Sequence, residues 1–130
     1  MIVFVLFAAA AAQQPAPAPA PATGIVPGWV EIGSTAQQRA FVDPEAVSRE
    51  GSRVRMRGRL ILAKPDETGM RTLDFQQELD CAARTWRVVS LEAKGEDGRE
   101  LVRHVAPADE PFQPIRAGSN AVEFERRYCR

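Results

Sequence analysis

Apolar and polar residues alternate along much of the chain, and this alternation predicts antiparallel strands. In residues 53–60, RVRMRGRL, every arginine falls on one face and the other residues fall on the opposite face. A period of two is typical of a strand with one buried and one solvated face. Similar patterns predict strands at 29–33, 40–43, 70–80, 84–94 and 100–105.

The long segments 70–80 and 84–94 also predict which side chains share a face. In the first, Leu73, Phe75, Gln77 and Leu79 are expected on one side. In the second, Trp86, Val88, Ser90 and Glu92 are expected to alternate against Arg87, Val89, Leu91 and Ala93. Both patterns assume regular strands that place successive side chains on opposite faces.

The period changes near the end of the chain. Three prolines predict a loop over 106–114, and 44–47 is compatible with one helical turn. After Gly118, either Ser119 or Asn120 can cap a helix that places Ala121, Phe124 and Tyr128 on one stripe. We therefore expect an α+β fold with a single curved antiparallel sheet of about five to six strands and a C-terminal helix.

The first 27 residues differ in composition from the rest. An uncharged apolar run at 2–12 ends in small residues, which is typical of a signal peptide, and we assign 1–12 to it. The run is shorter than the roughly 20 apolar residues that cross a membrane, so no stable membrane insertion is expected after cleavage. Residues 13–27 are expected to be a Pro/Ala-rich disordered linker, and 28–130 the folded domain.

Cys81 and Cys129 are the only cysteines in the chain. An exported protein, in the periplasm, at the cell surface or secreted, meets an oxidising environment in which two such thiols usually form one disulfide. Cys81 follows a predicted strand and Cys129 lies in the last turn of the predicted helix. Their disulfide is expected to tie the helix to the sheet.

Arg53, Arg55, Arg57 and Arg59 form the clearest candidate binding face. They could bind an anionic surface, or they could belong to a solvated sheet face in which acidic residues of the neighbouring strand pair with them. We favour the second interpretation, because the exposed faces of antiparallel sheets are normally polar.

Trp29 and Trp86 are candidate aromatic contacts for a protein partner or a sugar. Packing in the core is the favoured alternative, because a small domain needs bulky core residues. Lysine and arginine together number 17, as do aspartate and glutamate, so the chain lacks the basic excess expected of a nucleic-acid-binding protein.

The sequence offers little for catalysis. His104 is the only histidine, and it lies in a predicted strand where a surface position is favoured over a role as general base or ligand. One histidine and two bonded cysteines do not make a catalytic triad or a usual zinc site. We expect no catalytic residue, no metal and no cofactor.

The order and spacing of several short motifs resemble the surface-adhesin protein E-like domains of Gram-negative bacteria. These motifs are Trp29, Phe41-Val42-Asp43, 47–51 leading into Val54, Asp80-Cys81 with Arg84 and Trp86-Arg87, Gly95, and Tyr128-Cys129. The resemblance implies an exported antiparallel sheet whose C-terminal helix is held by a disulfide. The chain differs from the adhesin proper in having no lipobox cysteine near the expected cleavage site.

Two functions fit these observations. The first is an exported, non-catalytic binding module of the cell envelope, adhesin-like, whose partner is a protein or an envelope or extracellular-matrix component. The second is a structural or accessory periplasmic protein that stabilises an envelope assembly.

Overall fold

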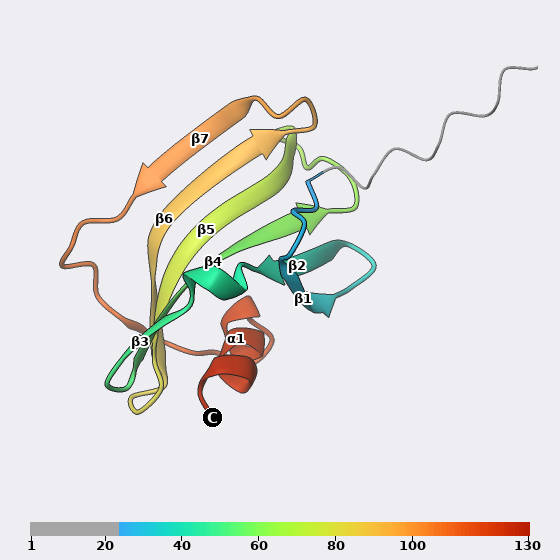
Figure 1. Cartoon of the computed structure of the whole chain (residues 1–130). Coiled ribbons are helices and arrows are strands. Elements are labelled where there is room, and N and C mark those ends of the chain that lie inside the picture. Colours follow the sequence, from blue (N-terminus) through green and yellow to red (C-terminus); the bar gives the residue numbers. More distant parts are fainter. Residues whose placement is uncertain (1–23) are drawn as a thin grey trace, which may run out of the picture.

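A computed structural model describes residues 24–130 of the chain (Figure 1). The expected signal peptide and residues 13–23 of the expected linker lie outside the described residues. The elements run in the order β1 (Val30–Ser34), β2 (Gln38–Val42), η1 (Pro44–Ala46), β3 (Ser48–Glu50), β4 (Arg53–Leu62), β5 (Met70–Asp80), β6 (Thr85–Gly95), β7 (Glu100–Val105), β8 (Gln113–Pro114) and α1 (Asn120–Tyr128).

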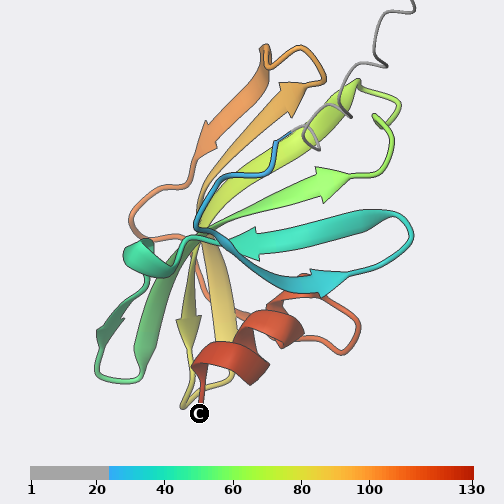
Figure 2. The same cartoon turned by 45° about the vertical axis from the view of Figure 1, so that its right-hand side comes forward.

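The strands form one curved antiparallel sheet in the order β1-β2-β4-β5-β6-β7, with β3 paired to β4 and β8 paired to β6. Helix α1 packs on one face of this sheet, as the two views show (Figures 1 and 2). The α+β class and the antiparallel sheet are confirmed, but eight strands form where five to six were expected.

The two additional strands are short. β3 has three residues, all exposed, so it carries no alternation to detect. β8 lies within the segment expected to be only a loop, and it contains Pro114. Proline is tolerated in a strand where its missing N–H is not needed by a neighbour, as at the edge of a sheet. The expectation of a plain loop over 106–114 is therefore wrong at its last two residues.

Strand β4 has the predicted two faces. Val54 and Met56 are buried, whereas Arg53, Arg55 and Arg57 are exposed. The buried face belongs to a core made of Val42, Val54, Met56, Phe75, Leu79 and Phe124. Gly58 lies opposite Phe75 in the pairing of β4 with β5. The phenyl ring of Phe75 meets that of Phe124 from α1 edge to face, with ring centroids 5.4 Å apart.

A β-bulge in β6 corrects the expected faces of that strand. Gln76 of β5 pairs with Ser90, but the next residue, Gln77, pairs with Val88, so Val89 has no partner in the register. An extra residue reverses the alternation beyond it. Leu91 consequently packs against the core, as Trp86 does, instead of sharing a face with Arg87.

Helix α1 presents Ala121 and Phe124 to the core, and Tyr128 packs beside them. Ser119 is the residue before the first turn, but its hydroxyl donates to the Arg116 carbonyl and does not cap the helix. Cys129 follows the helix and is bonded to Cys81 at the end of β5, with Cα atoms 5.2 Å apart. Within residues 24–130, no helix is long and apolar enough to cross a membrane.

Candidate functional site

The face of the sheet opposite α1 carries the four arginines of β4, and we call it the arginine face. Each of these side chains lies within 4 Å of a carboxylate. Arg57 binds Asp43 at 2.8 Å and Arg59 binds Asp74 of β5, while Arg53 and Arg55 approach Glu78 of β5 at 3.6 and 3.1 Å. The expected pairing with acidic residues of the adjacent strand is therefore present for three of the four arginines.

Arg57 is the exception, because its partner Asp43 does not lie on β5 but follows β2. The Asp43 carboxylate accepts from the Glu45 amide and so begins η1, while its other oxygen accepts from Arg57. Asp43 is only 8% exposed, and these partners supply the hydrogen bonds that a buried carboxylate needs. Arg57 therefore holds the connection between β2 and β3 against the sheet.

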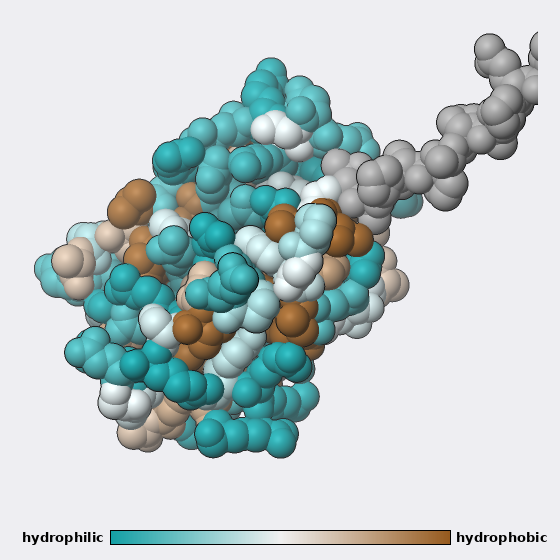
Figure 3. Space-filling model, viewed as in Figure 1, coloured by the Kyte–Doolittle hydropathy of each residue, from teal (hydrophilic) through white to brown (hydrophobic). Residues whose placement is uncertain are grey.

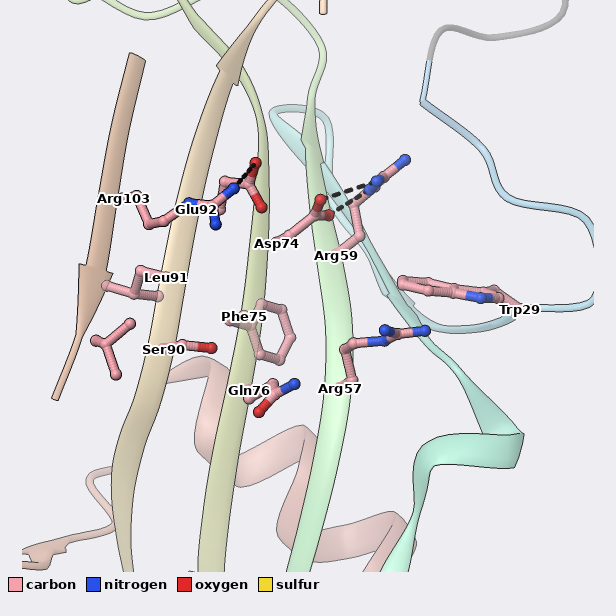
Figure 4. Close-up of a pocket in the computed structure, with 11 residues that line it drawn as sticks. Trp29, Arg57, Arg59, Asp74, Phe75, Gln76, Ser90, Leu91, Glu92 and Arg103 are labelled. Atoms are coloured by element: carbon pink, nitrogen blue, oxygen red, sulfur yellow. Dashed lines mark hydrogen bonds and ion pairs between the residues drawn. The ribbon is translucent and has the colours of Figure 1, made fainter. Parts of the chain in front are cut away.

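Trp29 covers the half of the arginine face that contains Arg57 and Arg59. Figure 4 shows its indole between the two guanidinium groups, which lie 5.5 and 5.6 Å from its ring centroid. Arg59 also donates to the Gly24 carbonyl at 2.7 Å. Residues 24–29 thus cross this half of the face, and beside them lies a hollow of about 370 Å³ that reaches Ser90 and Val105.

The other half of the arginine face is open. Arg53 and Arg55, with side chains 53% and 52% exposed, converge with Arg87 of β6 on Glu78. The Glu78 side chain is only 8% exposed, and its carboxylate is the centre of the cluster. These residues, with Ser48, Glu50 and Ser52, line a hollow of about 690 Å³.

Phe112 stiffens this open half. The guanidinium groups of Arg53 and Arg87 lie 5.0 and 4.5 Å from its ring centroid. Arg87 also donates to the Ala108 and Glu110 carbonyls, while its buried Nε has no hydrogen-bond partner among the described residues. The loop that follows β7 is therefore attached to the cluster through Arg87, which also donates hydrogen bonds to it, and through Arg53.

Asp80 fixes the turn at the end of the same strand. Its carboxylate accepts from the Ala83 and Ala82 amides and from the Ser52 hydroxyl. The Ala83 amide is the largest of the influences that lower the pKa of Asp80 below its ordinary value of 3.8. These hydrogen bonds hold the β5–β6 turn next to Cys81.

The remaining candidates lie elsewhere. Trp86 is half-buried and packs against the core, whereas Trp29 lies over Arg57 and Arg59, so the expectation of core packing is wrong for Trp29. His104 is exposed on the edge strand β7. Among residues 24–130, no three His, Cys, Asp or Glu side chains gather in a way that could hold a metal ion.

Sequence reasoning missed Glu78, Arg87 and Phe112 as members of the site. The polar alternation of β5 and β6 placed Glu78 and Arg87 in strands, but the register that brings them beside Arg55 was needed to join them. Phe112 lies in the proline-rich segment, where no periodic pattern indicates its direction.

Figure 3 shows that hydrophilic residues predominate on one side of the molecule and that apolar residues form small separated areas there. Large exposed apolar patches usually mark extensive hydrophobic interfaces. On this side, contacts with a partner would be mainly polar.

The sequence profile of the surface-adhesin protein E family matches residues 29–130. Among solved structures, protein E of Haemophilus influenzae matches with a TM-score of 0.54 and 16% sequence identity, over 85% of this chain and 89% of that protein. This likeness shows a shared fold, and no curated protein matches the chain significantly. Because the profile match spans most of the chain, this protein belongs to the surface-adhesin protein E family.

Proposed function

We propose that the chain is an exported, non-catalytic binding module of the cell envelope that acts as an adhesin-like protein. The binding site in this proposal is the open half of the arginine face, around Arg53 and Arg55. The observation that supports it most is the exposure of these two side chains, each more than half accessible, on a sheet face that α1 does not cover.

The charge of the site indicates the chemistry of the partner. Three arginines and two glutamates line the hollow, which leaves one net positive charge. Glu78 uses part of the hydrogen-bonding capacity of the arginines, but a guanidinium has five N–H donors and can bind a second carboxylate. An acidic segment of an envelope or extracellular-matrix protein fits this arrangement.

A rigid site also favours binding. Phe112 restrains the guanidinium groups of Arg53 and Arg87, and Glu78 restrains Arg55. Groups that are already held in position lose less conformational entropy when a partner binds. The open half of the arginine face therefore has both the charge and the order that a polar binding site needs.

The double variant Arg53→Gln/Arg55→Gln tests the proposal. The protein would be passed over immobilised envelope proteins and over an extracellular-matrix extract, and bound protein would be eluted with rising salt. Wild type is expected to bind and to be released as salt increases, because charge-assisted contacts between exposed groups are screened. The double variant is expected to lose most of this binding.

Arg99→Gln/Arg116→Gln is the matched control, since it removes the same charge from two exposed arginines elsewhere. Reversal of Arg57 to Glu is unsuitable as a test, because it would place a second carboxylate beside buried Asp43 and weaken the fold. Binding by the Arg53→Gln/Arg55→Gln variant that equals wild type would exclude the open half of the arginine face.

A structural or accessory role is the second candidate, and the edge strand β7 favours it. Val102 and Val105 are 61% and 70% exposed on this strand, which has β6 as a neighbour on one side only. An unprotected edge with exposed apolar residues can pair with another strand. Salt-resistant capture by the same extracts, unaffected by the Arg53→Gln/Arg55→Gln variant, would favour this role over the arginine face.

A further inference from the structure

The arginines without an acidic partner are unevenly distributed over the molecule. Eleven of the 17 lysines and arginines lie within 4 Å of a carboxylate. The six others among the described residues are Arg49, Lys64, Arg99, Arg116, Arg127 and Arg130. Three of these six, namely Arg49, Arg127 and Arg130, lie together at the C-terminal end of α1.

These three arginines and Arg126 line one shallow hollow of about 590 Å³, with Ile32, Glu123 and Tyr128 completing it. Arg49 reaches it from β3, a distant part of the sequence, and the arginines numbered 126, 127 and 130 belong to the end of the chain. The end of α1 lies at the surface of the molecule (Figure 1). We call this group of four arginines the C-terminal arginine cluster.

Two members of the cluster are held in place by backbone carbonyls. Arg49 donates through Nη1 to the Tyr128 carbonyl at 2.7 Å, and Arg130 donates through Nε to the Arg126 carbonyl at 2.8 Å. Each guanidinium retains most of its five N–H donors for another acceptor. These contacts satisfy carbonyls at the end of the helix, and they also position two cations at the hollow.

Helix capping alone does not account for the cluster. Arg127 is exposed, and its side chain makes no hydrogen bond or ion pair with another described residue. Glu123 is the one acidic side chain lining the hollow, and Arg126 already binds it at 3.1 Å. Three cations therefore remain without a counter-charge, and a carboxylate at the end of the chain would lower this surplus by one without removing it.

We propose that the C-terminal arginine cluster binds phosphate groups that carry more than one negative charge, such as a phosphate monoester or a pyrophosphate. Planar guanidinium groups bind phosphate oxygens through paired hydrogen bonds. A surplus of several cations matches a multiply charged anion better than a single carboxylate. Ile32 is the one apolar aliphatic residue lining the hollow, so the ligand is bound by charge and not by burial of apolar surface.

The site is distinct from the arginine face and is tested with different variants. Binding of inorganic pyrophosphate to the full chain would be measured by isothermal titration calorimetry at low and high salt. Arg127→Gln/Arg130→Gln is expected to weaken the affinity by about tenfold or more, because each charge-assisted hydrogen bond contributes appreciably. Arg53→Gln/Arg55→Gln and Arg99→Gln/Arg116→Gln are expected to bind as wild type does.

Binding to lipid vesicles shows whether the phosphate group can belong to a lipid head group. Flotation with phosphatidylcholine vesicles that do or do not contain phosphatidic acid presents the same monoester on a lipid surface. Binding of either probe that depends on Arg127 and Arg130 supports the proposal, and the vesicle arm shows whether the group can be a lipid head group. Failure of both probes to bind, or equal binding by Arg127→Gln/Arg130→Gln, would overturn it. Thermal unfolding of this variant checks that α1 is intact.

Discussion

At the residue scale, the fold depends on positions where a residue leaves space for a neighbouring side chain or neutralises its charge. Gly58 leaves room for the ring of Phe75, and Arg57 neutralises buried Asp43. The sequence predicted that Arg57 lies on a polar face, because alternation specifies the direction of a side chain. It could not predict the partner, because Asp43 reaches Arg57 from the end of another strand.

Replacement of Gly58 by alanine tests how closely the core is packed. A Cβ atom at this position would lie 2.5 Å from Cζ of Phe75 and 2.6 Å from the Phe41 carbonyl oxygen. The backbone oxygen cannot move aside easily, so we expect the free energy of unfolding to fall by about 1–3 kcal/mol. Urea denaturation followed by tryptophan fluorescence measures this change.

Gly33→Ala is the control for that measurement. Its added Cβ would meet its nearest neighbour, Cγ of Glu123, at 4.0 Å, which is an ordinary contact distance. It is expected to change stability little. Equal unfolding midpoints for the two variants would show that the sheet adjusts around Gly58 more readily than close packing implies.

At the element scale, long strands were predictable and irregular ones were not. The ten residues of β4 repeat one pattern, which identifies the strand and both its faces. The bulge at Val89 leaves no such signal, because a run of apolar residues is compatible with either alternation. Strands β3 and β8 form because neighbouring strands offer them hydrogen bonds, which is tertiary information that a local pattern lacks.

At the same scale, mutation of the disulfide can measure how strongly α1 is attached to the sheet. Nine residues are too few for a helix that is stable alone, so the core contacts of Phe124 and the Cys81–Cys129 bond must hold it. We expect Cys81→Ser/Cys129→Ser to lower the free energy of unfolding by about 2–4 kcal/mol.

Hydrogen exchange shows where that loss occurs. Amides of α1 are expected to exchange much faster in Cys81→Ser/Cys129→Ser, while those at the centre of β4 and β5 keep most of their protection. Uniform acceleration across the sheet and the helix would mean that the disulfide stabilises the whole domain, and that α1 is not a separately opening unit.

At the scale of the whole molecule, a net charge of zero conceals an uneven distribution. Most charges of the sheet faces are paired, and three of the five arginines without an acidic partner within residues 24–130 lie together at the end of α1. Composition gives the net charge, but local surpluses depend on which groups meet in the fold. The sequence therefore predicted the arginine face and not the C-terminal arginine cluster.

Three carboxylates that accept hydrogen bonds in the folded protein, those of Asp66, Asp80 and Glu125, make the stability of the whole domain sensitive to acid. Arg84 donates two hydrogen bonds of 3.0 and 2.9 Å to Glu125 of α1. These hydrogen bonds are the main reason that the pKa of Glu125 lies below its ordinary value of 4.5. The pKa of Asp66 is lowered chiefly by the Thr68 hydroxyl, and that of Asp80 by the Ala83 amide.

A carboxylate whose pKa is lower in the folded state stabilises the protein above the unfolded pKa, and it loses this contribution as the pH falls through the folded pKa. The free energy of unfolding is therefore expected to be level near neutral pH and to decline once the pH passes below about 4.5. Glu125→Gln isolates one contribution, since glutamine resembles the protonated acid. Urea midpoints of wild type and Glu125→Gln should differ at neutral pH, with wild type the more stable, and should converge in acid. A constant difference between the two at every pH would show that Glu125 acts through packing and not through its charge.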